Sequence, residues 1–119
     1  MMQARSFRAD ERANAAIEFA LTAPAFLALL FGAFQGALML WTQLGLQHAA
    51  ERAARCAAIN TTLCGTSAQV QAYALTQGLA NSLPASAFTL VSSGCVSATA
   101  NVRFVISTVS LSAQSCFPT

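Results

Sequence analysis

One long run without charge constrains this sequence more than any other feature. From Phe19 to Trp41 about 23 consecutive residues carry no formal charge, and as an α-helix they would extend over about 34 Å. That length crosses the hydrocarbon core of a bilayer, which is about 30 Å thick. A buried core helix can have the same composition, but the rest of this chain is too small to enclose one. We therefore predict one transmembrane helix over residues 19–41, with Trp41 in the headgroup layer.

Composition and charge agree with a membrane protein. Charged residues make up 8% of the chain, against about a quarter in ordinary soluble domains, and the mean hydropathy is +0.55. The net charge of +2 is too small, and too concentrated near the N-terminus, to suggest binding to nucleic acid. Arginines flank the apolar run on both sides: Arg5, Arg8 and Arg12 before it, Arg52 and Arg55 after it. Their distribution favours a cytoplasmic N-terminus.

A cleaved signal peptide is the alternative to a permanent anchor, because arginines followed by an apolar stretch also begin secretory signals. The run here is longer than the usual apolar region of a signal peptide, which has about 7–15 residues. The nearest small-x-small cleavage motif, Ala23-Pro24-Ala25, lies too early and has proline in its middle. The sequence therefore favours an uncleaved anchor.

All four cysteines follow the apolar run: Cys56, Cys64, Cys95 and Cys116. An even number of cysteines in a small exported domain predicts two disulfides formed in an oxidising compartment. Of the possible pairings we favour Cys56–Cys64, which closes a short loop at a helix end, and Cys95–Cys116, which ties the last strands together. There is no C-x-x-C motif and His48 is the only histidine, so we expect neither a thiol oxidoreductase nor a zinc site.

The helical pattern continues beyond the apolar run. We predict one long helix from about Glu11 to about Ile59, bent at Pro24, which removes a backbone donor. Beyond Trp41 one face of this helix consists mostly of alanine and covers Leu46, Ala49, Ala50, Ala53, Ala54 and Ala57. Either the protein's own exported domain or a partner helix can cover that face. Toward the other side, Glu51 and Arg55 stand in the favourable order for a helical ion pair.

A second helix is predicted after the first cysteine pair. Thr66-Ser67-Ala68-Gln69 has the form of a capping box, in which Thr66 is the N-cap. The helix should continue to about Leu79, with Gly78 near its end, and the residues Val70, Tyr73 and Ala74 should face inward. The stretch Asn81-Ser82-Leu83-Pro84 is typical of a loop.

The last third of the chain changes to the period of β-strands. Apolar and polar residues alternate in three stretches: Phe88 to Leu90, Val102 to Ile106, and Val109 to Ala113. Ser92-Ser93-Gly94 is a turn signal between strands. We predict a small antiparallel sheet that packs on the long helix.

Two features of the apolar run indicate a role in assembly. Glu18 immediately precedes the run. At that boundary a carboxylate can lie in water at headgroup depth or pair with a cation of a neighbouring subunit. Gly32-Ala33-Phe34-Gln35-Gly36 forms a G-x-x-x-G motif, whose two glycines let helix backbones approach closely, and Gln35 can hydrogen-bond across helices. No second acid, nucleophile or metal ligand accompanies Glu18, so the sequence offers no catalytic mechanism.

These residues also carry a resemblance to a known family. AAIEFALTAPAFLALLFGAFQGALMLW, followed by LQHAAERAARCAAI, resembles the TadE-like proteins of the tight adherence (Tad) pilus system, which are related in layout to type IV pilins and pseudopilins. The matching features are the start at Ala15 to Leu21, the Ala23-Pro24 pair, the F-G-x-x-x-G at Phe31 to Gly36, and the segment Ala49 to Arg55. The similarity covers residues 15–60, and the remainder agrees in outline only.

The resemblance implies a minor pseudopilin or pilus-assembly component of the bacterial inner membrane. In pilin-like proteins a prepilin peptidase cuts so that the glutamate becomes the fifth mature residue, which places the cut here between Ala13 and Asn14. Glu18 would then neutralise the free amine of a neighbouring subunit. Two positions depart from the family pattern. Ala13 stands where glycine is usual before the cut, and Gln35 stands where the family often has an acidic residue.

Taken together, the sequence predicts a membrane-anchored α+β protein with a pilin-like layout. Residues 1–13 form a cytoplasmic leader or tail, residues 14–60 the long helix, and residues 61–119 an exported periplasmic domain with a second helix and a short antiparallel sheet. The predicted function is structural, in a Tad-type adhesive pilus, without catalysis or cofactor. The predicted partners are other pilin-like subunits, Tad assembly proteins, a prepilin peptidase and the lipid bilayer. The alternative is an uncleaved, membrane-anchored periplasmic interaction module that never enters a filament.

Overall fold

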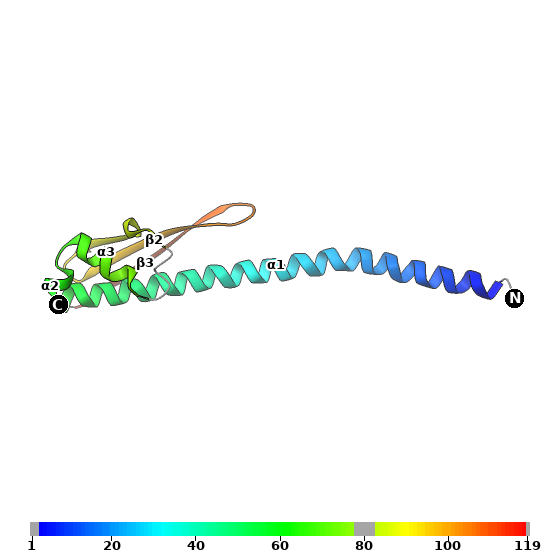
Figure 1. Cartoon of the computed structure of the whole chain (residues 1–119), viewed down its shortest axis with the longest axis horizontal. Helices are drawn as coiled ribbons and strands as arrows, with labels where there is room; N and C mark the ends of the chain where they lie inside the picture. The colour runs from blue at the N-terminus through cyan, green and yellow to red at the C-terminus, as the bar shows by residue number, and fades with distance from the viewer. Residues whose placement is uncertain (1–2, 78–82, 119) are drawn as a thin grey trace. The chain divides into compact units, whose positions relative to one another are not determined.

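The computed structural model describes residues 3–77 and 83–118, and the side chains among them from Asp10 onward. Within these residues the chain has an α+β fold, as predicted (Figure 1). Its elements, in chain order, are α1 (Gln3–Ile59), α2 (Thr61–Cys64), α3 (Ser67–Leu75), the 3-10 turn η2 (Ala85–Ala87), β1 (Phe88–Ser92), β2 (Cys95–Arg103) and β3 (Thr108–Cys116). They fall into two compact units, Met1–Gly36 and Ala37–Thr119.

The first unit contains α1 up to Gly36. The helix begins at Gln3, earlier than the predicted start near Glu11, because the intervening residues include several good helix formers and no glycine or proline. It continues through Pro24 without a break, and the predicted bend at that residue stays a prediction. Between Asp10 and Ile59, α1 is long and apolar enough to cross a membrane, and the rest of the chain buries none of its most apolar stretch.

The second unit is built around the last turns of α1. The alanine face predicted from the sequence lies in its core, where Leu46, Ala49, Ala50, Ala53, Ala54 and Ala57 are all buried. The chain's own domain covers this face, which decides between the two occupants that the sequence left open. Buried side chains from the other elements complete the core, among them Val70 and Ala74 of α3 and Phe88 of β1.

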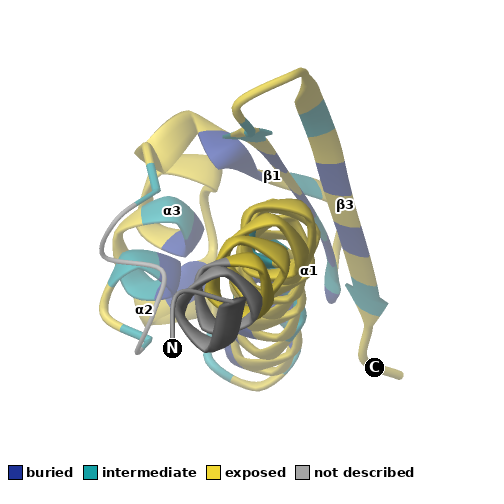
Figure 2. Ribbon diagram, turned by 90° about the vertical axis from the view of Figure 1, so that its right-hand side faces the viewer, coloured by how far each residue is buried: buried dark blue, intermediate teal, exposed yellow. Residues whose placement is uncertain are grey.

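The three strands form an antiparallel sheet in the order β1-β2-β3. Buried and exposed positions alternate along β2 and β3, as Figure 2 shows for β3. Three of the four residues in two core-facing cross-strand pairs are alanine, since Ala98 lies opposite Ala113 and Ala100 lies opposite Leu111. An alanine-rich sheet face therefore shares a core with an alanine-rich helix face. Such small side chains let backbones pack closely and leave room for few large groups.

One strand boundary differs from the prediction. The alternation of Val102, Phe104 and Ile106 predicted a strand through Ile106, but β2 ends at Arg103 and residues 104–107 form the turn to β3. The Phe104 amide donates to the Ser107 carbonyl at 2.7 Å, and Arg103 pairs with Thr108 across the hairpin. The prediction was wrong beyond Arg103 because pairing with β3, and not the strand propensity of Phe104 to Ile106, sets where the chain reverses.

Helix α3 begins where it was predicted and ends earlier. Thr66 is its N-cap, and the capping box with Gln69 is complete. The helix stops at Leu75 instead of near Leu79, because the Thr76 hydroxyl and amide both turn back to the Tyr73 carbonyl. Val70 and Ala74 are buried as expected, and Tyr73 is half-buried against the core. The predicted positions Gly78, Asn81 and Ser82 lie outside the described residues.

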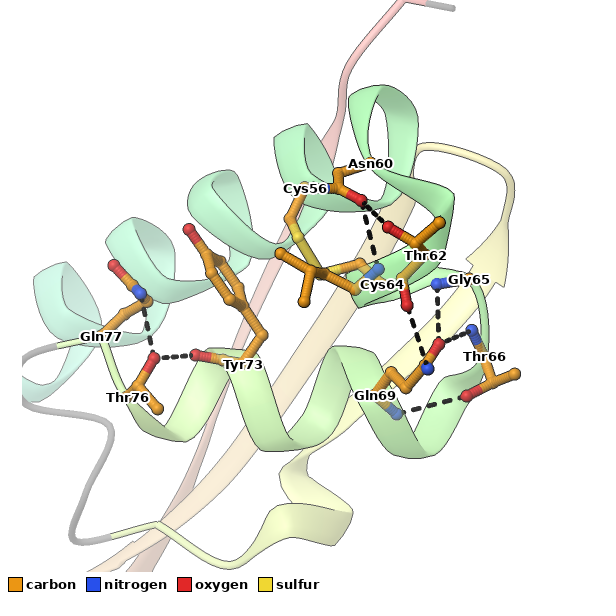
Figure 3. The surroundings of a disulfide bond; sticks show 11 residues. Cys56, Asn60, Thr62, Cys64, Gly65, Thr66, Gln69, Tyr73, Thr76 and Gln77 are labelled. Carbon is orange, nitrogen blue, oxygen red and sulfur yellow. Dashed lines mark hydrogen bonds between the residues drawn. A yellow bond between two sulfur atoms is a disulfide. The ribbon is translucent and has the colours of Figure 1, made fainter.

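The first predicted disulfide, Cys56–Cys64, closes the corner between α1 and α2 (Figure 3). Asn60 caps α2 there through a hydrogen bond from the Leu63 amide to its side-chain oxygen. Gly65 follows the cysteine, and a Cβ at this position would collide with the Thr61 carbonyl oxygen. The Gln69 side chain accepts hydrogen bonds from the amides of Gly65 and Thr66 and donates to the Thr62 carbonyl. The corner is thus fixed by one covalent link and a connected set of hydrogen bonds.

The second predicted disulfide, Cys95–Cys116, joins the first residue of β2 to the last residue of β3. These two residues are direct partners in the antiparallel register, with their Cα atoms 4.1 Å apart. The Phe117 amide donates to the Gly94 carbonyl at 2.8 Å just beyond the bridge. The open end of the hairpin is therefore closed covalently, at the opposite end from the turn at residues 104–107.

Candidate membrane and assembly segment

Glu18 and the predicted processing residues lie on the exposed surface of α1. Ala13, Asn14 and Glu18 are all helical with exposed side chains. Asn14 and Glu18 are four residues apart and so share one face of the helix. Among the side chains that the structure describes, none bonds to the Glu18 carboxylate. The Thr22 hydroxyl donates to the Glu18 backbone carbonyl at 2.9 Å, a contact that does not involve the carboxylate.

The two glycines of the G-x-x-x-G motif are not required by the packing of this chain. A Cβ built on Gly32 or on Gly36 would meet nothing within 4 Å, apart from the helix's own backbone. Gln35 lies between them in sequence and is half-exposed. In a helix interior, glycine costs about 1 kcal/mol relative to alanine. Two glycines therefore weaken the isolated helix without making room for anything in the described part of the chain.

Large apolar side chains surround this segment on the exposed surface of α1. Phe19, Leu21, Phe26, Leu29, Leu30, Phe31 and Phe34 are each at least half exposed, and Leu29 is 75% exposed. The largest contiguous apolar patch of an ordinary soluble monomer is about 300–600 Å² and often marks a binding surface. A run of side chains of this size over several helical turns is instead typical of a surface covered by lipid or by other helices.

The polar side of α1 in the second unit differs from the prediction. Glu51 and Arg55 were expected to pair, but Glu51 accepts a hydrogen bond from the Gln47 amide group at 3.2 Å. Arg55 instead places its guanidinium over the Phe117 ring, 5.9 Å from the ring centroid. An exposed ion pair on a helix contributes only about 0.3–0.5 kcal/mol, so a cation–π contact of similar or greater strength replaces it easily.

The described residues of the second unit line two hollows. One hollow beside the first disulfide is lined by Arg52, Arg55, Ile59, Leu63 and Tyr73, and another, near η2, is lined by Leu83, Pro84 and Asn101. Among the residues that the structure describes, no three histidine, cysteine, aspartate or glutamate side chains come together to hold a metal ion. The described cysteines are all in disulfides.

Sequence reasoning missed one exposed feature, the apolar turn between β2 and β3. Val105 and Ile106 are 88% and 95% exposed, although a strand was predicted to pair them. Little in the sequence signals this turn, because residues 102–107 contain no glycine, proline, asparagine or aspartate and Ser107 is their only common turn former.

With the geometry described, comparison with known proteins adds one finding. The model of the TadE-like protein family matches residues 14–55. No curated protein and no solved structure matches the chain. The matched segment begins at Asn14, contains Glu18 and the G-x-x-x-G motif, and ends at Arg55, four residues before α1 does. The predicted family resemblance is confirmed, and residues 14–55 of α1 are a TadE-like segment.

Proposed function

We propose that this protein is a structural component of a Tad-type pilus, a minor pseudopilin that acts through α1. In this proposal α1 crosses the bacterial inner membrane with its N-terminus in the cytoplasm, and the disulfide-bonded unit lies in the periplasm. The observation that carries the proposal is the family match over residues 14–55, which coincides with an exposed apolar helix of membrane-spanning length. The proposed partners are other pilin-like subunits, whose helices would pack against the same segment.

Processing by a prepilin peptidase is part of the proposal. The family match starts at Asn14, the residue that would become the new N-terminus. Both Ala13 and Asn14 are exposed, and no described contact of the folded domain would be lost by removing residues 1–13. Ala13 differs from the glycine usual before such a cut, and alanine is the next smallest side chain. We propose that the cut occurs there and leaves Glu18 as the fifth residue.

The alternative function is a permanent membrane anchor for a periplasmic interaction module. It shares the fold, the apolar helix and the family match, and differs in that residues 1–13 stay attached. The compact, doubly disulfide-bonded domain is compatible with both functions. The two functions differ in whether the peptide bond between Ala13 and Asn14 is cut.

The intact mass of the chain tests this choice. The protein is isolated from membranes of cells that carry the matching prepilin peptidase, and from control cells that lack it. The proposal expects a mass starting at Asn14 in the first preparation and the full-length mass in the second. A full-length mass in both preparations would exclude processing and favour the permanent anchor.

The glycine motif gives a second prediction. Changing Gly32 and Gly36 to leucine should lower crosslinking between α1 helices in the membrane by about tenfold, because the leucine side chains would prevent the close backbone approach that the glycines allow. The folded domain should be unaffected, because nothing in the described chain approaches either glycine. Crosslinking between single cysteines is unsuitable in a chain with two disulfides. A photoreactive amino acid at Leu29, which is exposed and lies on the same helix face three residues before Gly32, is the better probe.

A matched pair of substitutions controls for added bulk. Ala33 and Ala37 are also exposed and also four residues apart, but they lie about 100° further around the helix. Leucine at these two positions adds the same kind of side chain to a different face. Equal losses of crosslinking in both double variants would show that the motif does not define the contact face.

A further inference from the structure

The turn between β2 and β3 presents an apolar tip, residues 103–106, that the fold does not use. Val105 and Ile106 are almost fully exposed, and Phe104 is half-exposed. The turn is nevertheless well formed, because the Phe104 amide bonds to the Ser107 carbonyl. Arg103, at the base of the tip, is exposed as well. The side chains of Val105 and Ile106 bury almost no apolar surface against the described residues and so add little to the stability of the fold. Any binding surface that they contact would therefore lie outside the described residues.

Two contacts fix the direction of β3 along α1 within the second unit. The Gln43 side chain donates to the Ser112 carbonyl at 3.0 Å, and the Arg55 guanidinium lies over the Phe117 ring. Residue numbers rise together in both contacts, so β3 runs in the same direction as α1. Between Ser112 and Thr108, the first residue of β3, the strand covers about 13 Å, which equals about nine residues of helix. Gln43 lies only six residues beyond Ala37, the first residue of the second unit, so the turn lies at the end of that unit where its part of α1 begins.

The tip, the orange turn in Figure 1, therefore lies at the end of the second unit at which α1 enters that unit. The same end of α1 exposes further apolar side chains, namely Leu38, Leu40, Trp41 and Leu44. The disulfide Cys95–Cys116 and the turn at Ser93 and Gly94 lie at the other end of the sheet. Exposed apolar groups from two separate elements are thus found at one end of the unit.

The chemistry of the tip fits the surface of a lipid bilayer. Valine and isoleucine can lie at the boundary between headgroups and acyl chains. An arginine beside them can extend its apolar stem along the same boundary and place its charge among the phosphates. Anionic lipids attract such a cation. A protein partner would need an apolar pocket of its own to accept these side chains. The bilayer needs none, and it lies next to the domain at the point where α1 leaves the membrane.

We propose that the tip at residues 103–106 inserts into the bilayer leaflet from which α1 emerges, with Arg103 at the phosphates of anionic headgroups. This inference rests on the proposed membrane crossing of α1. The tip would give the domain a second point of attachment to the membrane, in addition to α1. Two attachment points fix the rotation of the domain about the helix axis, and so determine which face of the domain a neighbouring subunit meets.

Depth-dependent quenching of tryptophan fluorescence tests the insertion. The full chain is reconstituted in vesicles of phosphatidylethanolamine and phosphatidylglycerol whose acyl chains carry bromine at a known position. Trp41 is the only tryptophan, so the native chain reports on α1 itself. In a Trp41→Phe background, Ile106→Trp reports on the tip. Val91→Trp is the matched control, because Val91 is also an exposed strand-end residue, 60% exposed, at the other end of the same sheet.

The proposal expects the Ile106→Trp reporter to lose about half of its emission to bromines near the carbonyl ends of the acyl chains, as suits a depth of about 5–10 Å. It expects little loss from bromines near the methyl ends and little from the Val91→Trp reporter at any depth. Adding Arg103→Gln should reduce the quenching of the Ile106→Trp reporter by about twofold in these anionic vesicles.

The outcomes separate the tip from the anchor. Quenching of native Trp41 without quenching of the Ile106→Trp reporter would overturn the insertion and leave the membrane crossing of α1 intact. Blue-shifted but unquenched emission from that reporter would show that a second copy of the chain covers the tip, and would also overturn the proposal. If native Trp41 is not quenched either, the membrane crossing itself is wrong.

Discussion

A chain with Glu18→Gln should insert into the membrane as well as the native protein and yet support at least about tenfold fewer surface pili. The carboxylate is exposed at the mouth of the apolar run, and no described side chain of this protein bonds to it. Removing its charge therefore has no cost within the subunit. In an assembly, however, the amine of the neighbouring subunit would lose its partner. An unpaired charge in a membrane helix costs about 2.5 kcal/mol at the bilayer centre, and this cost falls toward the interface.

The Glu18→Gln result has to be separated from failed processing and failed insertion. The intact mass of the variant reports processing, and resistance to alkaline carbonate extraction reports insertion. Glu51→Gln is the matched control, since Glu51 is also an exposed glutamate of α1 but lies in the second unit with Gln47 as its hydrogen-bond partner. Normal piliation by the Glu18→Gln chain, with normal processing, would show that the carboxylate has no pairing role.

Phe88→Ala should destabilise the folded second unit by about 3–5 kcal/mol, the usual cost of removing a buried phenylalanine. Phe88 is fully buried and is the largest side chain that the described core encloses completely. It begins β1, lies opposite Ala98, and its carbonyl accepts a hydrogen bond from the Gln71 side chain. The core around it consists largely of alanine, whose short side chains have little reach to fill the space that the ring leaves.

A loss of that size removes much of the 5–15 kcal/mol by which domains are usually stable. Chemical denaturation of the full chain in detergent, with the disulfides intact, measures it. Near-ultraviolet circular dichroism is the appropriate signal because α1 keeps its helical signal in detergent when the domain unfolds. Val91→Ala in the same strand is the control and should change the free energy of unfolding by less than about 0.5 kcal/mol. A change below about 1 kcal/mol for Phe88→Ala would mean that the packing described here is wrong.

The sequence predicted those parts of the fold whose signals are local and strong. The capping box at Thr66 and Gln69 is a short-range pattern with a definite geometry, and it forms as expected. The alanine positions from Ala49 to Ala57 repeat with the helical period, and the same period places them in the core. The two disulfides follow from the positions of the cysteines relative to the elements, at a helix end and at the end of a hairpin.

The strand boundaries depended on pairing, which the sequence shows only weakly. The core-facing residues of β2 from Val96 to Ala100 include two alanines, so their alternation has low contrast. The stronger alternation from Val102 to Ile106 covers the last residues of β2 and part of the turn that follows. Ile106 lies in that turn and is exposed, so it adds nothing to the core. For the assembly segment, the structure adds that neither Gly32 nor Gly36 is explained by the chain's own packing. The roles of Glu18 and Gln35 stay predictions, because they concern partners outside this chain.

The most direct test of the central claim is to count surface pili on the organism that encodes this protein, with its gene deleted and then restored. The proposed function predicts that deletion removes the pili, or reduces them at least about tenfold, and that the native chain restores them. A chain restricted to residues 37–119 behind a cleavable secretion signal should not restore them, because it lacks the TadE-like segment up to Gly36. Unchanged pilus number after deletion would contradict the assignment to pilus assembly.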